Sequence, residues 1–198
     1  DLYICFNDIN LENIADRLNR YGCVVIKNVF NDLEINALRA IVAKHLATGG
    51  QRALLGKAQP NAAVELPELS SLISDSRILR IFSKIYNSKA FYFTGHCDIH
   101  QNLISGWHKD SGEAYGGYFD GDYFSEDSLG VYKIALYLQQ EITPGNGLSV
   151  QLGSHRSKEM DHSKPVDLLT KCGDIVIFDV RLNHMGQKPT KYENAIYK

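Results

Sequence analysis

The clearest structural signal in the chain is GDIVIFDVRLNH, residues 173–184. Its apolar core, residues 175–178, follows a Gly-Asp pair and leads into polar residues. A short apolar run with turn residues at its boundary is typical of a buried strand. Pro189 follows soon after His184, so we expect His184 to stand where this strand ends.

Strand-like patterns recur through the second half of the chain. AFYFTGHCDIHQNLIS, residues 90–105, alternates in the manner of a strand, and VYKIALYLQQE, residues 131–141, and LSVQLGSH, residues 148–155, have a similar character. Residues 144–147, Pro-Gly-Asn-Gly, have the composition of a tight turn. These patterns predict several short strands joined by turns.

The first half of the chain has a helical period instead. Apolar residues recur at helical spacing in residues 9–22, 31–46 and 68–87. Residues 23–30 between the first two helices read as a short buried strand, and residues 51–67 have no period and are expected to form a loop.

Helices followed by short strands indicate an α+β fold that is mainly β. We expect an antiparallel barrel or jelly roll as its body. The length of 198 residues suits a single domain, with helical support mainly in residues 1–89 and the β core mainly in residues 90–198. Because the chain stops inside a strand-like segment, we expect the natural chain to continue beyond Lys198.

Composition narrows the class of partner. The net charge is −2 and no block of basic residues occurs, which disfavours a nucleic-acid partner. The four cysteines form neither a zinc motif nor a disulfide framework, which favours a cytoplasmic protein. No apolar run is long enough for a membrane span. The oligomeric state is left open by these features.

Two His-x-Asp motifs are candidates for a metal site: His96-Cys97-Asp98 and His108-Lys109-Asp110. Residues i and i+2 of a strand point to the same side, so such a pair can reach one ion. Two histidines and one carboxylate on one face of a metal form the ligand set of non-haem Fe(II) sites. His184, on a distant strand, is the candidate for the second histidine.

Geometry favours the second motif. His96, Asp98 and His100 are expected to follow one straight strand, which would place the two histidines about 13 Å apart, too far for one ion. His108 and Asp110 instead lie where a strand gives way to a Gly- and Tyr-rich loop. We therefore expect His108, Asp110 and His184 to be both the metal ligands and the catalytic centre.

The sequence resembles the phytanoyl-CoA dioxygenase family of Fe(II)/2-oxoglutarate-dependent oxygenases. The likeness is carried by GWHKDSG (106–112), by YKIALYLQQEITPGNGLSVQLGSHR (132–156) and by GDIVIFDVRLNHMG (173–186). LNRYGCVVIKNVFNDLEINALRAIV (18–42) also resembles the opening of that family.

This resemblance implies a double-stranded β-helix (a jelly roll of the cupin kind) with flanking N-terminal helices. It implies that His108, Asp110 and His184 bind Fe(II), that 2-oxoglutarate chelates the iron, and that O₂ is the co-substrate. The family usually anchors the far carboxylate of 2-oxoglutarate with an arginine beyond the distal histidine. This chain has none there, so Lys198 is the candidate anchor and Gln101 a second polar contact.

The implied activity is hydroxylation, or another oxidation, of a small organic molecule with release of succinate and CO₂. Related halogenases lack the carboxylate ligand, so Asp110 favours hydroxylation over halogenation. Trp107 packs beside the metal loop or contacts the substrate, and Tyr115 and Tyr118 belong to an aromatic loop that suits a substrate lid. Two alternatives remain open: a non-catalytic jelly-roll binding protein, and a 2-oxoglutarate-independent metal enzyme on the same fold.

Overall fold

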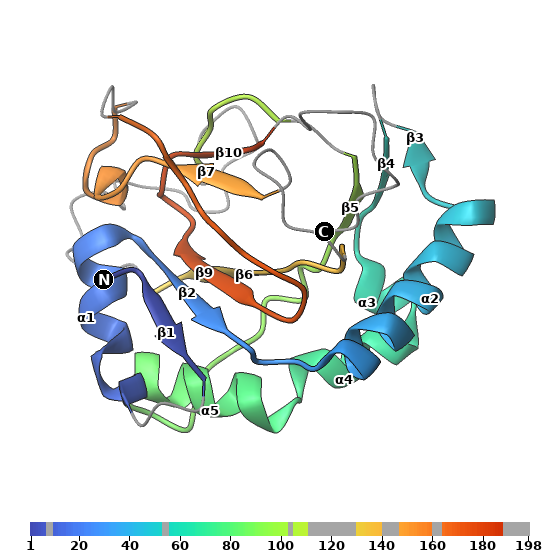
Figure 1. Cartoon of the computed structure of the whole chain (residues 1–198), viewed down its shortest axis with the longest axis horizontal. Helices are drawn as coiled ribbons and strands as arrows, with labels where there is room; N and C mark the ends of the chain where they lie inside the picture. The colour runs from blue at the N-terminus through green and yellow to red at the C-terminus, as the bar shows by residue number, and fades with distance from the viewer. Residues whose placement is uncertain are drawn as a thin grey trace.

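A four-stranded sheet forms the centre of the protein (Figure 1). The computed structural model describes residues 1–6, 10–52, 56–102, 105–110, 130–139, 147–159 and 164–187. The strand order is β1-β2-β9-β6, in which β1 and β2 are parallel and the other pairs antiparallel. The strands are β1 (Tyr3–Cys5), β2 (Cys23–Lys27), β9 (Ile175–Asp179) and β6 (Tyr132–Leu136).

Two smaller antiparallel sheets accompany the central one. The first has the order β10-β7-β8 and lies above the central sheet in Figure 1. Its strands are β10 (His184–Gly186), β7 (Leu148–Val150) and β8 (Val166–Asp167). The other has the order β3-β4-β5 and consists of β3 (Gln51–Arg52), β4 (Lys57–Gln59) and β5 (Ile99–Gln101). Within the described ranges none of these sheets closes on itself, so the fold is mixed helix and sheet without a completed barrel.

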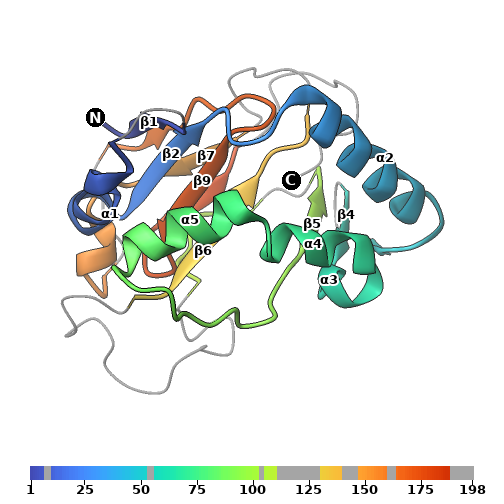
Figure 2. The same ribbon diagram turned by 90° about the horizontal axis from the view of Figure 1, so that it is seen from below.

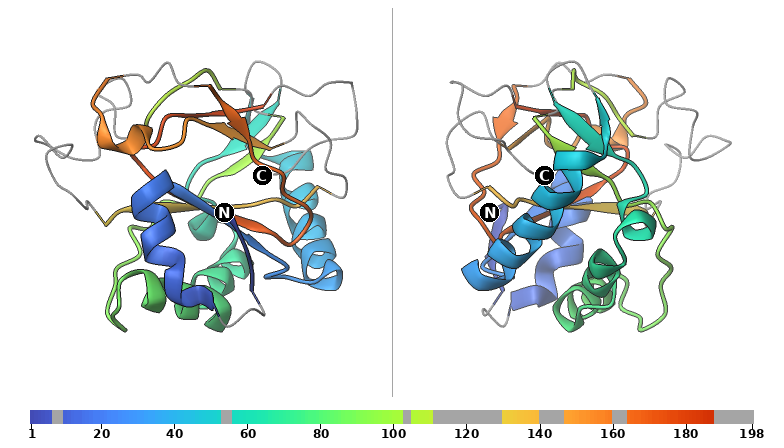
Figure 3. Two further views of the ribbon diagram at one scale, coloured as in Figure 1. Left: turned by 60° about the vertical axis from the view of Figure 1, so that its left-hand side comes forward. Right: turned by 90° about the vertical axis from the view of Figure 1, so that its right-hand side faces the viewer.

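Helices cover the face of the central sheet that points away from β7 and β10. In Figure 2, α5 lies across this sheet, with α1 at one end and α2 at the other, and Figure 3 shows the same layering from two further sides. The helical segments are η1 (Asn10–Asn13), α1 (Ile14–Tyr21), α2 (Asp32–Thr48), α3 (Ala62–Glu65), η2 (Pro67–Leu69), α4 (Ser70–Ile73), α5 (Ser76–Ile85) and η4 (Ser154–Arg156). No helix in the described part of the chain is long and apolar enough to cross a membrane.

Local sequence signals explain where the long helices begin and end. The Asn31 side chain accepts from Glu34 N while the Glu34 carboxylate accepts from Asn31 N, a reciprocal cap that starts α2. The carboxylate of Asp75 caps α5. Gly22 ends α1 in the left-handed conformation, with φ 78°.

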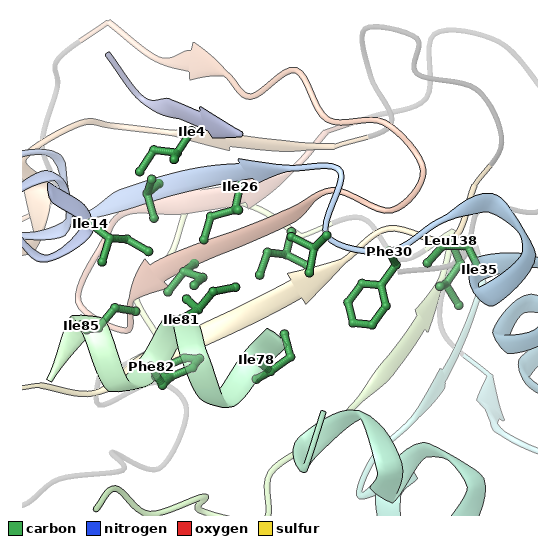
Figure 4. Packing of buried hydrophobic residues seen from close by; sticks show 14 of the residues in the cluster. Ile4, Ile14, Ile26, Phe30, Ile35, Ile78, Ile81, Phe82, Ile85 and Leu138 are labelled. Atoms are coloured by element: carbon green, nitrogen blue, oxygen red, sulfur yellow. The ribbon is translucent and has the colours of Figure 1, made fainter. Parts of the chain in front are cut away.

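The two faces of the central sheet bury alternate residues of the same strands. On β9, Ile175 and Ile177 pack with the helices, whereas Val176 and Phe178 face the β10-β7-β8 sheet. A strand buried on both faces reads as a continuous apolar run, which is why IVIF has no polar alternation. Figure 4 shows part of the helix-side core, including Ile26 of β2 and Ile81 of α5.

The turn that enters β9 needs its glycine. Gly173 has φ +84°, and a Cβ there would lie 2.1 Å from Phe30 O. Val29 N and Phe30 N both donate to Gly173 O, each at 3.0 Å. Glycine is therefore required both for the backbone conformation and for this close approach.

The predicted helices and strands are largely confirmed, but two segments in the first 105 residues differ from the prediction. Residues 90–105 were expected to form one strand, but among the described residues of this range only Ile99–Gln101 pair, and Gly95, at φ +82°, bends the chain before them. Residues 51–67 were expected to form a loop, but they contain β3, β4 and α3. The short β4 exists because it finds β5 as a partner, and no local pattern reveals such tertiary pairing.

The burial of β9 on both faces of the central sheet leads to a prediction about stability. Ile177→Ala should lower the free energy of unfolding by about 2–5 kcal/mol, because it leaves a cavity at a fully buried position. Ile134, directly opposite on β6, is 38% exposed and serves as the control. Ile134→Ala should change the free energy of unfolding by about 1 kcal/mol or less. Urea unfolding measures both, and equal losses would contradict the assigned burial.

Candidate metal centre

The main chains of His108 and His184 are paired. His108 N donates to His184 O at 3.0 Å, and His184 N donates to His108 O at 2.9 Å. This isolated antiparallel bridge places the His108 segment beside β10, whose other edge pairs with β7. Two segments far apart in sequence are thus held in register, with their imidazole ring centroids 4.3 Å apart.

Asp110 completes a three-residue cluster. His108 Nε2 lies 3.7 Å from Asp110 Oδ1, and His184 Nε2 lies 3.6 Å from Asp110 Oδ2. The three candidate ligand atoms all lie within 4.8 Å of one another. The carboxylate–imidazole distances are too long for hydrogen bonds. Atoms bound to one ion at about 2.1 Å lie roughly 3–4 Å apart, so the spacing suits a shared ion.

The hydrogen bonds of the two rings fix which nitrogen faces the cluster. His108 Nδ1 lies 2.7 Å from Gly106 O, and His184 Nδ1 lies 2.9 Å from Leu182 O. A carbonyl oxygen only accepts, so each Nδ1 must carry the hydrogen. In the neutral ring the lone pair is then on Nε2, which points at Asp110. This is the arrangement of metal-binding histidines, whose second nitrogen is held by a carbonyl or carboxylate.

Asp110 Oδ2 is buried and accepts no hydrogen bond within the described part of the chain. Lys133 Nζ lies 3.0 Å from this oxygen and forms an ion pair with it, but the angles of the contact are not those of a hydrogen bond. A buried carboxylate oxygen without a hydrogen bond is unfavourable unless a cation is bound. The donor set and this oxygen therefore fit a divalent metal ion.

Burial keeps His184 neutral. Its residue is 5% exposed, and its ring packs against the Phe178 ring with centroids 4.8 Å apart. Burial lowers the pKa of His184 to about 4, while the Asp110 charge acts in the opposite direction. A neutral imidazole is the form that binds a metal.

His184 follows a turn and does not lie at the end of the preceding strand. The strand that we expected to end at His184 stops at Asp179, and His184 opens β10. Asp179 Oδ1 accepts from Arg181 N at 2.8 Å, and its carboxylate pairs with the Arg181 guanidinium at 2.8 Å. An aspartate that bonds its own backbone two residues on favours a chain reversal. This reversal moves His184 into the second sheet.

Lys109 connects the His-x-Asp segment to the turn after β9 through hydrogen bonds. Although it lies between two candidate ligands, it is 6% exposed. Its Nζ donates to Ser154 O at 2.5 Å and to Arg181 O at 2.9 Å. Lys109 thereby supports the relative position of the two segments that carry the candidate ligands.

The other predicted site residues have mixed outcomes. Gln101 ends β5 and Trp107 is partly exposed next to His108, and neither has a role that the structure tests. Lys198, Tyr115 and Tyr118 lie outside the described residues.

The upstream motif lacks the geometry that we assumed for it. His96 and Asp98 lie outside any strand, with His96 Nε2 3.3 Å from Asp98 Oδ2, so the straight-strand argument against them was wrong. The only metal-compatible cluster in the described part of the chain is nevertheless His108, Asp110 and His184.

Sequence reasoning missed Lys133 and Lys109. In YKIALY, residues 132–137, Lys133 shares its strand face with Ala135 and Tyr137, so period-2 alternation would have placed a lysine on the inner face. For Lys109 no pattern in the sequence indicates burial.

Comparison with known proteins gives a fold. No protein-family model and no curated protein matches the sequence. Among solved structures, the non-heme alpha ketoglutarate dependent carbocyclase SnoK from nogalamycin biosynthesis is 19% identical, with a TM-score of 0.75 over 96% of this chain and 82% of that one. HygX from Streptomyces hygroscopicus, with nickel and 2-oxoglutarate bound, is 15% identical, with a TM-score of 0.68 over 91% and 81%.

A further similar structure is an oxidoreductase of the 2OG-Fe(II) oxygenase family from Burkholderia pseudomallei. It is 16% identical, with a TM-score of 0.65 over 100% of this chain and 91% of that one. At these identities the likeness establishes that the chain shares the fold of these enzymes.

The buried ring of His184 predicts a pH dependence of stability. Between about pH 6.5 and 4 the unfolded chain takes up a proton that the folded ring does not, so acidification should destabilise the metal-free protein. One such group contributes at most about 1.4 kcal/mol per pH unit. Urea unfolding in the presence of a chelator should show a shallower pH slope for His184→Gln. Identical slopes for the variant and the wild type would contradict the assigned burial of the ring.

Proposed function

We propose that this chain is an Fe(II)- and 2-oxoglutarate-dependent dioxygenase that hydroxylates or otherwise oxidises a small organic molecule. The observation that carries the proposal is the cluster of His108, Asp110 and His184, with both Nε2 atoms facing one carboxylate. Two histidines and a carboxylate are the ligand set of non-haem iron oxygenases. Support also comes from the shared fold with SnoK, HygX and the 2OG-Fe(II) oxygenase.

Each residue of the cluster has a proposed task. His108 and His184 would bind the ion through Nε2, because their Nδ1 atoms are held by carbonyl oxygens. Asp110 would supply the anionic ligand, which favours oxidation of the substrate over transfer of a halide. Iron, 2-oxoglutarate and O₂, when bound, supply the oxidising chemistry, with succinate and CO₂ as co-products.

The surroundings of the cluster suit a preorganised metal site. The Phe178 ring covers one side of His184 and limits access of water to it. Lys109 and the main-chain bridge hold the two ligand-bearing segments together before any ion binds. Ligands that are fixed in advance lose less conformational entropy on binding.

We further propose that residues 1–198 act as one oxygenase domain with a double-stranded β-helix. In this domain Gln101 and Lys198 would contact the co-substrate. Trp107, Tyr115 and Tyr118 would contact the substrate.

A purely structural role for the cluster is less favourable. A non-catalytic binding protein would keep two imidazole Nε2 atoms directed at a carboxylate whose buried oxygen accepts no hydrogen bond within the described residues and has the Lys133 ammonium as its counter-charge. A bound metal ion compensates all three groups at once.

The proposal predicts the effect of Asp110→Ala. The protein is purified without oxygen, loaded with Fe(II) and 2-oxoglutarate, and then exposed to air while succinate is measured. Asp110→Ala should lower succinate formation by about 100-fold or more, because losing even an outer partner of a metal ligand costs 10–100-fold. The weak visible charge-transfer band of the iron–2-oxoglutarate complex should also disappear.

Asp98→Ala is the matched control, because Asp98 belongs to the other His-x-Asp motif. It should leave the band and the succinate yield within about 2-fold of the wild type. Loss of iron in Asp98→Ala and retention in Asp110→Ala would transfer the site to the upstream motif. A wild-type protein that binds iron but has no affinity for 2-oxoglutarate would favour a different metal enzyme on this fold.

A further inference from the structure

A group of exposed basic residues lies on α5 and on the segment that follows it. Residues 76–97 hold four lysines and arginines and no aspartate or glutamate, although acidic residues outnumber basic ones in the whole chain, 23 to 21. One of the four, Arg77, is neutralised by two carboxylates near the starts of α5 and α2. The other three, Arg80, Lys84 and Lys89, are exposed and pair with no carboxylate in the described part of the chain.

The fold places these charges on the outside of the molecule. α5 turns Ile78, Ile81 and Ile85 toward the central sheet, where they are buried. Residues four apart share a helix face, so Arg80 and Lys84 lie together on the side of α5 that faces solvent. Figure 2 shows α5 on the outer side of the molecule, with the chain that follows it running alongside.

Two exposed aromatic side chains accompany the cations. After α5 the chain folds back along the helix, because the Phe91 ring packs against the rings of Phe82 and Tyr86, with centroids 5.8 and 5.9 Å apart. The next two side chains remain outside, since Tyr92 is 98% exposed and Phe93 is 51% exposed. Exposed apolar surface with a polar rim is typical of an interaction site.

Charge and shape favour a lipid surface as the partner. A two-fold pair of this chain joined through α5 would bring the cations of one copy close to those of the other, which is repulsive. A single-stranded nucleic acid is usually held in a groove that follows its backbone, whereas these residues lie on the outer side of a helix. Anionic headgroups attract lysine and arginine, and aromatic rings favour the boundary between headgroups and acyl chains.

We propose that the solvent face of α5 and the segment after it bind the surface of an anionic phospholipid membrane. Arg80, Lys84 and Lys89 contact the headgroups, and Tyr92 and Phe93 enter the headgroup layer. Each cation near such a surface strengthens binding by roughly 5-fold, so the three together give roughly 100-fold. The inference goes beyond the proposed function and does not depend on it, because the metal cluster lies on the opposite face of the central sheet.

Co-sedimentation of the full chain with vesicles tests the proposal. One kind of vesicle contains equal parts of phosphatidylserine and phosphatidylcholine, and the other contains phosphatidylcholine alone. The wild type should bind the anionic vesicles roughly 100-fold more strongly, and added salt should weaken this binding. Lys84→Glu/Lys89→Glu should lower the affinity for anionic vesicles by about 25-fold or more. Tyr92→Ser/Phe93→Ser should lower it by about 10-fold or more, because the rings no longer leave water.

Matched variants place the same changes on other surfaces. Lys158→Glu/Lys164→Glu alters the net charge equally at two exposed lysines before β8. Leu33→Ser removes a side chain on α2 that is 82% exposed. Both controls should stay within about 2-fold of the wild type, because salt screens charges that are far from the membrane. Urea unfolding should show that every variant keeps the wild-type stability within about 0.5 kcal/mol, as is usual for exposed positions.

Four results would overturn the proposal. The first is equal binding to both kinds of vesicle, or no binding to the anionic vesicles at low salt. The second is an equal loss in Lys158→Glu/Lys164→Glu, which would assign the binding to net charge alone. The third is unchanged binding of Tyr92→Ser/Phe93→Ser, which would leave the two rings without a role. The fourth is binding of a single-stranded oligonucleotide with none to vesicles, which would identify a nucleic-acid surface instead.

Discussion

The pair of main-chain hydrogen bonds between His108 and His184 is the interaction on which the site depends. It fixes two segments from distant parts of the chain side by side and in one register. Because Asp110 follows His108 by two residues, the same register brings its carboxylate to both imidazole rings. A shift of this pairing by one residue would turn one imidazole ring to the opposite side of its strand, and the three side chains would no longer lie together.

The rest of the fold supports this pairing from both sides. The central sheet is packed by helices on one face and by the β10-β7-β8 sheet on the other, so Phe178 is pressed against the His184 ring. The turn after β9 and the buried Lys109 join the two layers near the candidate ligands. The charges of Asp110 and Lys133 lie in this half-buried setting, where low polarity strengthens their interaction.

Local signals in the sequence predicted the elements that have a clear helical period or a continuous apolar run. The periods of α2 and α5 and the apolar run of β9 were enough to place them. The alternation in residues 90–105 was misleading, because one glycine in a left-handed conformation bends the chain, and the pairing of β4 with β5 is a tertiary event. The grouping of His108, Asp110 and His184 was predicted from the sequence, although the straight-strand argument against the other motif was wrong. The path to His184 was not predicted, since the reversal at Asp179 depends on side-chain hydrogen bonds. Lys133 was missed although strand alternation contained the signal.

The most direct test of the account is the position of a bound metal ion. A crystal of the protein soaked with Fe(II) or nickel(II), measured at the absorption edge of that metal, should show one strong anomalous peak. The account predicts this peak at about 2.0–2.2 Å from His108 Nε2, His184 Nε2 and one Asp110 oxygen. A fully occupied peak between His96 and Asp98, with no peak at His108, would contradict it.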